Sequence, residues 1–382
     1  MAVRRHRRRL SRCLAVAVAG AVGVASAVGV AAANPPAAVQ APPSAPALAG
    51  AARAAADLPR LHSLLVSWRG ELILEHYARG IRPTRPANIK SAAKSIISLL
   101  VGIAIDRQLI AGVEEPIVRF FPQLRRDPDP RKQEITIEDL LTMRSGLEST
   151  SGGGYGRWVR SRNWVRYALE RPLVSDPGTS MEYSTGTSHV LSAILTKATK
   201  TSTWQFAQTV LARPLGLTLA RWPRDPQGIY FGGNDMLVTP RQMIAFGELF
   251  LNRGRHGDTH IVPASWVDES CEPRTVSRWN PDQRYGYGWW IRDFAGHPGC
   301  FAWGYGGQYI LVFHELDLVV AVTSSTSVSE ERRGHRRLLF ELIERHVLEQ
   351  VEETDPQNEA TKSTERNEGA AVLAGGGPGS PW

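Results

Sequence analysis

The sequence predicts a mixed α/β protein of the α+β type, in which one antiparallel sheet is assembled from the N- and C-terminal segments of a single domain. Strand-like runs lie at both ends of residues 57–350, and helical patterns fill the stretch between them. The sheet is therefore expected to be flanked by helices, with a mostly helical region inserted into it. A cleft between sheet and insert is the natural place for a functional site.

The N-terminal strands are predicted at 61–68 and 71–78, where LHSLLVSW and ELILEHYA flank a turn at Arg69 and Gly70. Alternation and β-branched residues predict three more strands in the C-terminal third, followed by a closing amphipathic helix. These elements are expected at 285–291, 307–313, 317–324 and about 330–349.

The helical middle begins with a long stretch from about Ser91 to Asp106. A shorter apolar helix is predicted at 136–143, where Thr136 and Asp139 resemble a capping box. Further helical patterns run over 188–199, 203–212 and 240–252.

The two ends of the chain differ from this domain. Residues 1–33 join six arginines to an apolar run of Ala, Val and Gly that ends in small residues, which is typical of a secretory signal peptide. Residues 34–56 form a Pro/Ala-rich linker and residues 351–382 a disordered tail. Export to the periplasm or the medium is therefore expected, with membrane attachment only if the apolar run stays uncleaved.

The net charge of +8 resides mostly in the N-terminal segment. Without its six arginines, the chain has 39 basic and 37 acidic residues. A nearly neutral body lacks the basic surface that binds a polyanion, so no nucleic-acid partner is expected.

Two of the three cysteines, Cys271 and Cys300, lie in the predicted domain. An oxidising compartment permits a disulfide between them. Spacing alone leaves the paired and the free state equally open, because it does not fix the geometry of the two side chains.

Ser91-Ala92-Ala93-Lys94 forms an S-x-x-K tetrad at the start of the first long helix. Residues three apart share a helix face, and amides at a helix N-terminus favour developing negative charge. A buried lysine of lowered pKa can take a serine proton, which makes Ser91 a candidate nucleophile and Lys94 its candidate base. The alternative is that the tetrad is a solvated helix face.

The rarity of lysine favours the catalytic interpretation. The chain has 39 arginines but only six lysines, at positions 90, 94, 132, 197, 200 and 362. Where only a positive charge is needed, this sequence usually has arginine, which cannot give up its proton as a base must. A lysine at position 94 is therefore informative.

Two further elements follow the tetrad. Tyr183-Ser184-Thr185 precedes a predicted helix, and a phenol there could relay a proton between nucleophile and leaving group. The Gly-rich stretch 302–308 leads into a strand, where glycines let a substrate lie against the backbone. Taken singly, each is equally compatible with a core tyrosine or an ordinary turn.

Taken together and in this order, the three elements resemble the motifs of the serine β-lactamase and penicillin-binding-protein superfamily. Other segments resemble its class C-type branch, which includes esterases, D-amino-acid peptidases and 6-aminohexanoate-oligomer hydrolases. They are KSAAKSIISLLVGIAIDRQLI, TIEDLLTMRSGLE, HVLSAILTKAT, LVTPRQMIAFGELFLNRG and GYGGQYILVFHELDLVVAVTSS. GYGGQ and the PQG…GG stretch at 226–233 are most similar to the nylon-oligomer-hydrolase-like subgroup. The resemblance covers about 57–350 and implies the β-lactamase/transpeptidase-like fold.

The resemblance implies Ser91 as acylated nucleophile, Lys94 as base, Tyr183 as acid/base partner, and the amides of Ser91 and Tyr305 as oxyanion hole. It implies no cofactor, and a small ester, amide or short peptide as substrate. Predicted substrate contacts are Thr185, Trp303, Gly304, Gly306 and Tyr155. Tyr155, Trp158, Trp164, Trp303 and Tyr305 could together form an aromatic cleft, although scattered aromatic residues more often belong to the core.

Two positions depart from the superfamily pattern. Thr185 stands where the Y-x-N element has asparagine, and Ala302 stands where the K/H-T/S-G element has its cation. Both missing groups normally help to hold a β-lactam, so short esters and linear amides are the expected substrates. A D-aminopeptidase, a D,D-carboxypeptidase or a β-lactamase is the alternative.

Two other functional classes fit the sequence less well. A metal hydrolase is disfavoured because the ten histidines are scattered and form no H-E-x-x-H motif or Cys/His cluster, so no metal is expected. A non-catalytic penicillin-binding module would lose the nucleophile or the base, and both are present. The sequence leaves the oligomeric state and the natural substrate open.

Overall fold

The computed structural model describes residues 48–354. The predicted signal peptide, most of the predicted linker and most of the predicted tail lie outside this range. None of the helices within it is long and apolar enough to cross a membrane.

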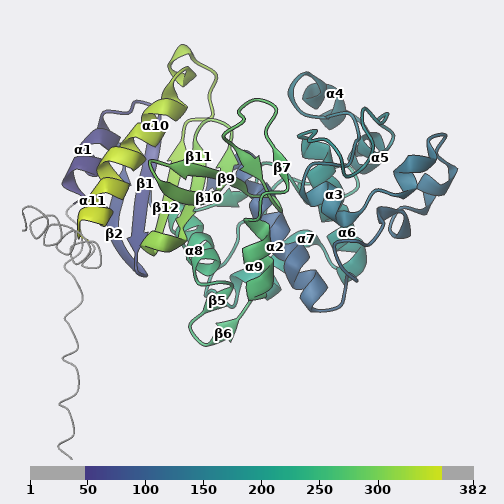
Figure 1. The fold of residues 1–382 in the computed structure, drawn as a ribbon, viewed down its shortest axis with the longest axis horizontal. Helices are drawn as coiled ribbons and strands as arrows, with labels where there is room; N and C mark the ends of the chain where they lie inside the picture. The colour runs from purple at the N-terminus through teal and green to yellow at the C-terminus, as the bar shows by residue number, and fades with distance from the viewer. Residues whose placement is uncertain (1–47, 355–382) are drawn as a thin grey trace, which may run out of the picture. The chain divides into compact units, whose positions relative to one another are not determined.

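A single eight-stranded antiparallel sheet organises the described residues, in the order β2-β1-β12-β11-β10-β9-β8-β7 (Figure 1). Its strands are β1 Leu61–Trp68, β2 Glu71–Tyr77, β7 Thr275–Val276, β8 Arg284–Tyr285, β9 Trp290–Phe294, β10 His297–Gly304, β11 Gln308–Phe313 and β12 Leu318–Ser324. The N-terminal hairpin joins the C-terminal strands because β1 pairs with β12, with Leu64 opposite Val322. The predicted sheet built from both ends of the domain is therefore confirmed.

Two small ladders lie outside this sheet. They pair β3 Ala87–Asn88 with β4 Leu237–Val238, and β5 Arg255–His256 with β6 Thr259–His260. The helices are α1 Ala49–Ala56, α2 Ala93–Asp106, α3 Ile137–Leu141, α4 Tyr155–Val159, α5 Trp164–Leu169, α6 Thr185–Thr199, α7 Thr203–Ala207, α8 Pro240–Leu251, α9 Ala264–Ser270, α10 His335–Ile343 and α11 Glu349–Thr354. Helices α3 to α6 lie together beyond the β7–β10 part of the sheet in Figure 1, which is the predicted helical insert.

The central strands are buried on both faces because helices cover each face. In β12, Val319 and Ala321 join the core formed with α2 and α8, whereas Val320 and Val322 join the core formed with α1 and α10. Successive strand residues point to opposite faces, so a strand covered on both sides is apolar throughout. This explains the uninterrupted apolar run of β12.

The linker prediction is wrong for its last eight residues, which form α1. Ala51 and Ala55 are fully buried where α1 packs against β1 and α10. Alanine has the highest helix propensity, and its small side chain lets a helix lie close to a sheet. The tail prediction is likewise wrong at its start, because α11 continues to Thr354 and buries Val351.

Three predicted elements differ in detail from the structure. The strand predicted at 285–291 is interrupted by a turn in which Gly286 N donates to Trp289 O (2.9 Å), so it separates into β8 and β9. The helix predicted from about 330 begins at His335, and the one predicted from Ser91 starts with a 3₁₀ turn, η1 Lys90–Ala92. The capping box of Thr136 and Asp139 is present as predicted.

Cys271 and Cys300 form a disulfide, with their Cα atoms 5.9 Å apart. The bond joins the residue that ends α9 to the middle of β10. It thereby anchors the strand that leads into the Gly-rich turn.

Candidate active site

Ser91 lies in η1, between strand β3 and helix α2. The residue before it, Lys90, has a left-handed backbone conformation (φ 52°). Its amide donates to Asn88 Oδ1 (3.0 Å), and its Nζ pairs with Asp235 Oδ1 (2.8 Å). Non-glycine residues seldom adopt positive φ without such support, and they cluster at functional sites. The local backbone thus holds Ser91 in a fixed, sharply bent connection.

Lys94 lies one turn after Ser91 on α2, and its Nζ donates to Ser91 Oγ over 3.1 Å. Its second hydrogen bond goes to the carbonyl oxygen of Gly233 (2.6 Å), and its ammonium lies 4.9 Å from the ring centre of Tyr183. Only 4% of Lys94 is exposed, and no carboxylate among the described residues pairs with it. Burial therefore lowers the pKa of Lys94 from 10.5 to about 7, because desolvation penalises the charged form.

Gly233 is held in place by a buried histidine–aspartate pair. His189 Nε2 lies 3.0 Å from Asp225 Oδ2, and both side chains are completely buried. The amide of Gly232 donates to the other ring nitrogen, Nδ1 (3.3 Å), so the partners imply a proton on Nε2. His189 thus fixes the backbone next to the carbonyl that receives Lys94.

Tyr183 places a buried phenol next to the side chains of Ser91 and Lys94. Its hydroxyl has no hydrogen-bond partner of good geometry among the described residues. Burial raises the pKa of Tyr183 to about 12, and the neighbouring Ser91 side chain opposes this shift. The ring stacks on Trp290 at a centroid distance of 5.7 Å. Tyr183 is therefore rigidly placed and remains protonated at neutral pH.

A group of hydroxyls joins the segment after Tyr183 to a neighbouring loop. Ser149 Oγ donates to Tyr183 O (2.7 Å), and Ser151 Oγ lies 2.9 Å from both the amide and the Oγ1 of Thr185. Thr150 Oγ1 accepts from the amide of Gly186 (2.8 Å). Thr185 thus faces the cavity while its hydroxyl is already engaged.

The Gly-rich stretch forms a tight turn between β10 and β11, closed by Gly307 N donating to Gly304 O (3.2 Å). Gly306 has φ +90°, which suits glycine at this place in a turn. A Cβ on Gly304 would lie 2.1 Å from the carbonyl oxygen of Ile89, so only glycine lets β10 approach the Ser91 segment. The backbone N–H of Tyr305 has no hydrogen-bond partner within residues 48–354 and is free to serve a ligand.

A cavity of about 440 Å³ opens beside Ser91. Its lining consists of Lys90, Ser91, Ser151, Gly152, Tyr155, Tyr183, Thr185, Asn234, Trp303 and Tyr305. The structure thus brings together the predicted nucleophile, the predicted acid/base tyrosine, the predicted oxyanion-hole residue Tyr305 and three of the predicted substrate contacts, which are Tyr155, Thr185 and Trp303.

Other predicted cleft residues have different places. Gly304 and Gly306 do not line the cavity; they allow the backbone to approach Ile89 and Ser325 closely. Trp158 and Trp164 are buried together, with ring centroids 5.2 Å apart, in the aromatic core around His189. Ala302 is also fully buried, so its methyl group faces core side chains and not the cavity.

Several residues of the site were missed from the sequence. Asn234 lines the cavity and donates to the hydroxyl of Tyr155 (2.9 Å). Asp235, Gly233 and the His189–Asp225 pair come from segments far from Ser91 in sequence. The GG dipeptide within the 226–233 stretch was the only available signal, and it did not indicate which side chains would meet there.

The geometry has the components of acyl transfer: a serine, a buried base of lowered pKa, a protonated phenol and a free backbone amide. In the described part of the chain, no group of three or more His, Cys, Asp or Glu residues is arranged to hold a metal ion.

Comparison with known proteins agrees with this geometry. The family model for Beta-lactamase matches residues 60–343. The chain belongs to the β-lactamase family. Its members are serine hydrolases, and the protein is an enzyme of that kind.

Solved structures with the same fold have diverse activities. A Bacillus anthracis protein described as a 6-aminohexanoate-dimer hydrolase matches with a TM-score of 0.62 and 19% identity, over 75% of this chain and 80% of that chain. The hydrolase EstCE1, described as having promiscuous acyltransferase activity, gives a TM-score of 0.64 and 17% identity over 78% and 97%. A class C β-lactamase from Rhodobacter sphaeroides matches with a TM-score of 0.59 and 18% identity, over 78% of this chain and 99% of that chain. No curated protein sequence matches the chain. At these identities, the structural matches establish the fold alone.

Proposed function

We propose that this β-lactamase-family protein is an exported hydrolase that cleaves short esters or linear amides through an acyl-enzyme on Ser91. The observation that carries the proposal is the hydrogen bond between Lys94 Nζ and Ser91 Oγ (3.1 Å), made by a lysine whose pKa is lowered to about 7. About half of such lysines are neutral at pH 7, which is the state a general base requires.

The proposed reaction begins when neutral Lys94 accepts the proton of Ser91 as Oγ attacks the substrate carbonyl carbon. The amides of Ser91 and Tyr305 would stabilise the oxyanion that develops. Tyr183, protonated at neutral pH, would donate a proton to the leaving alcohol or amine and regain one from Lys94. Water then attacks the acyl-enzyme and releases the carboxylic acid.

The proposed substrate preference rests on two positions that depart from the superfamily pattern, Thr185 in the cavity lining and Ala302 in the core. Ala302 is buried and uncharged, so it cannot bind a substrate carboxylate. The hydroxyl of Thr185 hydrogen-bonds to Ser151, at the position where the superfamily has an asparagine whose amide would bind an acylamino group. Losing one charge-assisted hydrogen bond typically costs about 1.5–3 kcal/mol, or roughly ten- to a hundredfold in affinity. Simple acyl bonds need neither group.

Export is proposed from the signal-like residues 1–33, which lie outside the described range. The Cys271–Cys300 disulfide supports it, because structural disulfides persist mainly in oxidising compartments.

A hydrolysis panel tests the substrate proposal. kcat/KM is measured for p-nitrophenyl butyrate, the linear 6-aminohexanoate dimer, D-alanine p-nitroanilide and nitrocefin, on the protein and its Ser91→Ala variant. We expect the ester, and next the linear amide, to exceed nitrocefin by at least about tenfold. Equal turnover of nitrocefin would refute the interpretation of Ala302 and Thr185, and preference for the D-alanine compound would indicate a D-peptidase.

A further inference from the structure

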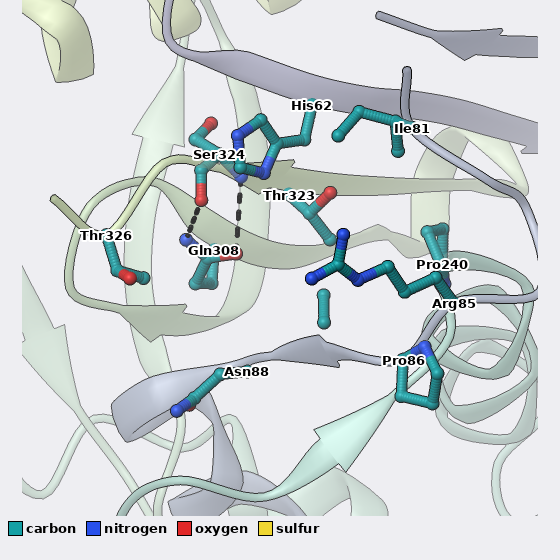
Figure 2. A pocket seen from close by; sticks show the side chains of 11 residues that line it. His62, Ile81, Arg85, Pro86, Asn88, Pro240, Gln308, Thr323, Ser324 and Thr326 are labelled. Carbon is teal, nitrogen blue, oxygen red and sulfur yellow. Dashed lines mark hydrogen bonds between the residues drawn. The ribbon is translucent and has the colours of Figure 1, made fainter.

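A second, smaller pocket of about 250 Å³ lies at the end of the central strands and is lined by Gln308, whose side chain also donates to the carbonyl oxygen of Tyr305 (3.4 Å). Its walls come mainly from β1, β11, β12, β3 with the loop before it, and the first residue of α8, as Figure 2 shows. The polar residues that line it are His62, Arg85, Asn88, Gln308, Thr323, Ser324 and Thr326. None of the lining residues, all within the described range, is acidic.

His62 is directed into this pocket by an irregularity in β1. Leu61 pairs with Ser324 and Ser63 with Thr323, so His62 is an extra residue with no partner on β12. Such bulges often re-aim a side chain beside a functional site. Neither ring nitrogen of His62 hydrogen-bonds to a described residue, so the imidazole is available to a ligand.

Arg85 enters from the opposite wall. Figure 2 shows its guanidinium reaching into the pocket toward Thr323. Its backbone is restrained because Pro86 follows it and its amide closes a turn on Arg82 O (3.0 Å). Within residues 48–354, no carboxylate pairs with this guanidinium, although such a fork-shaped donor is suited to bidentate binding of oxyanions.

Two more basic residues, Arg60 and His335, lie close to this pocket without lining it. Arg60 is only 3% exposed and donates to the carbonyl oxygens of Ser325 and Ser327 (both 2.7 Å). It reaches a carboxylate, that of Glu331, only through the hydroxyl of Ser329. His335 is buried with its Nε2 3.0 Å from Ser324 Oγ.

The charges around the pocket are therefore poorly compensated. Burial, Arg60 and Arg85 together lower the pKa of His62, and burial, Arg60 and His62 lower that of His335 to about 4. No acidic group contributes to either shift. Arg60 is a buried positive charge without a direct carboxylate partner, and the exposed Arg85 faces the same pocket, so a bound anion would compensate both charges.

We propose that this pocket binds a small oxyanion, a carboxylate or a phosphate, through Arg85, His62 and the hydroxyl-bearing end of β12. The volume limits the ligand to a small molecule. A bound anion would also contact Gln308 and Asn88, two lining residues whose hydrogen bonds lead to the active site. Gln308 Nε2 donates to Ser324 O (2.7 Å) and Tyr305 O (3.4 Å), while Asn88 donates to Asp235 (2.7 Å), the partner of Lys90.

The test follows the imidazole of His62 by NMR in the full-length protein, with ¹⁵N-labelled histidine and a His62→Gln spectrum for assignment. Inorganic phosphate and acetate are titrated separately, with chloride at matched ionic strength as reference. An anion against the ring favours its charged form, so the pKa of His62 is expected to rise on binding.

Arg85→Gln is expected to weaken this binding by roughly ten- to a hundredfold, whereas Arg82→Gln, an exposed neighbour that does not line the pocket, leaves it unchanged. A response to either anion or both supports the proposal and identifies the ligand class. An unaltered His62 pKa with both anions would overturn it, and so would equal binding by the Arg85→Gln variant. Because the readout needs no turnover, a failure here is distinct from a failure of the proposed hydrolase activity.

Discussion

At the scale of single residues, the site depends on a lysine that has been taken out of water without a carboxylate partner. A structural lysine in such a place would normally be paired, because an isolated buried ammonium costs several kcal/mol. Among residues 48–354, the hydrogen-bond partners of Lys94 Nζ are a carbonyl oxygen and the Ser91 hydroxyl. Its environment therefore favours the neutral amine, which explains why arginine, the usual cation of this chain, would not serve at this position.

The pH dependence of activity follows from the same residue. Below a pKa of about 7 Lys94 is protonated and cannot act as base, so kcat/KM for p-nitrophenyl butyrate should rise about tenfold per pH unit below 7 and level off above it. Tyr183, with a pKa of about 12, adds no descending limb below pH 10. Lys94→Arg should lose this profile and most activity. A wild-type profile that is flat from pH 5 to 9 contradicts Lys94 as base.

At the scale of elements, the loop that precedes β4 matters as much as the helix that carries the tetrad. Asp225 Oδ1 accepts from the amides of Gln227 and Ile229 (2.8 and 2.9 Å), which leaves Oδ2 to orient His189. His189 in turn orients the amide of Gly232, next to the carbonyl that binds Lys94. The pair thus fixes the backbone next to the carbonyl that binds Lys94, the proposed base.

The variant Asp225→Asn tests this arrangement. Its amide nitrogen would face His189 Nε2 and require the other tautomer, which places an N–H against the N–H of Gly232. We expect kcat to fall by at least about tenfold, because Lys94 loses its alignment with Ser91. KM should change much less, because the residues that contact the substrate stay in place. Asp258→Asn, on an exposed turn, is the matched control. An Asp225→Asn enzyme with wild-type kcat would show that the pair has only a structural role.

The Cys271–Cys300 disulfide, which holds β10 to the end of α9, is expected to contribute to the stability of the fold. It closes a loop of 29 residues, and removing it with Cys271→Ala and Cys300→Ala should lower the free energy of unfolding by roughly 3–4 kcal/mol through the larger entropy of the unfolded chain. Urea unfolding of the oxidised wild type and the double variant measures the difference. A change below about 1 kcal/mol would mean that the unfolded chain gains little freedom, contrary to this expectation.

At the scale of the whole molecule, the fold was predictable because its strands and long helices carry strong periodic patterns. The tetrad, the Tyr183 segment and the Gly-rich turn were also identifiable, since each is a local motif. Asn234, Asp235 and the His189–Asp225 pair were not, because their roles arise only where distant segments meet. The aromatic residues Trp158 and Trp164 were misplaced for a related reason: composition cannot distinguish a wall of a cleft from a core.

Export is a property of the complete chain and is tested on the native host. If residues 1–33 are a cleaved signal, the mature protein should begin near Asn34 and be found outside the cytoplasm in soluble form. Amino-terminal sequencing of fractionated protein measures this. An intact N-terminus in the membrane fraction would identify the segment as an anchor.

The proposed mechanism depends on a covalent bond to Ser91, and intact-protein mass spectrometry after treatment with a fluorophosphonate measures that bond most directly. One equivalent should add to the protein, on the peptide that contains Ser91, and the rate should rise with pH through about 7 as Lys94 becomes neutral. Ser91→Ala should take up no label, while Ser95→Ala, one helical turn further along α2, should label normally. A folded wild type that stays unlabelled at pH 8, or that carries the label on another residue, would contradict the assignment of Ser91 as nucleophile.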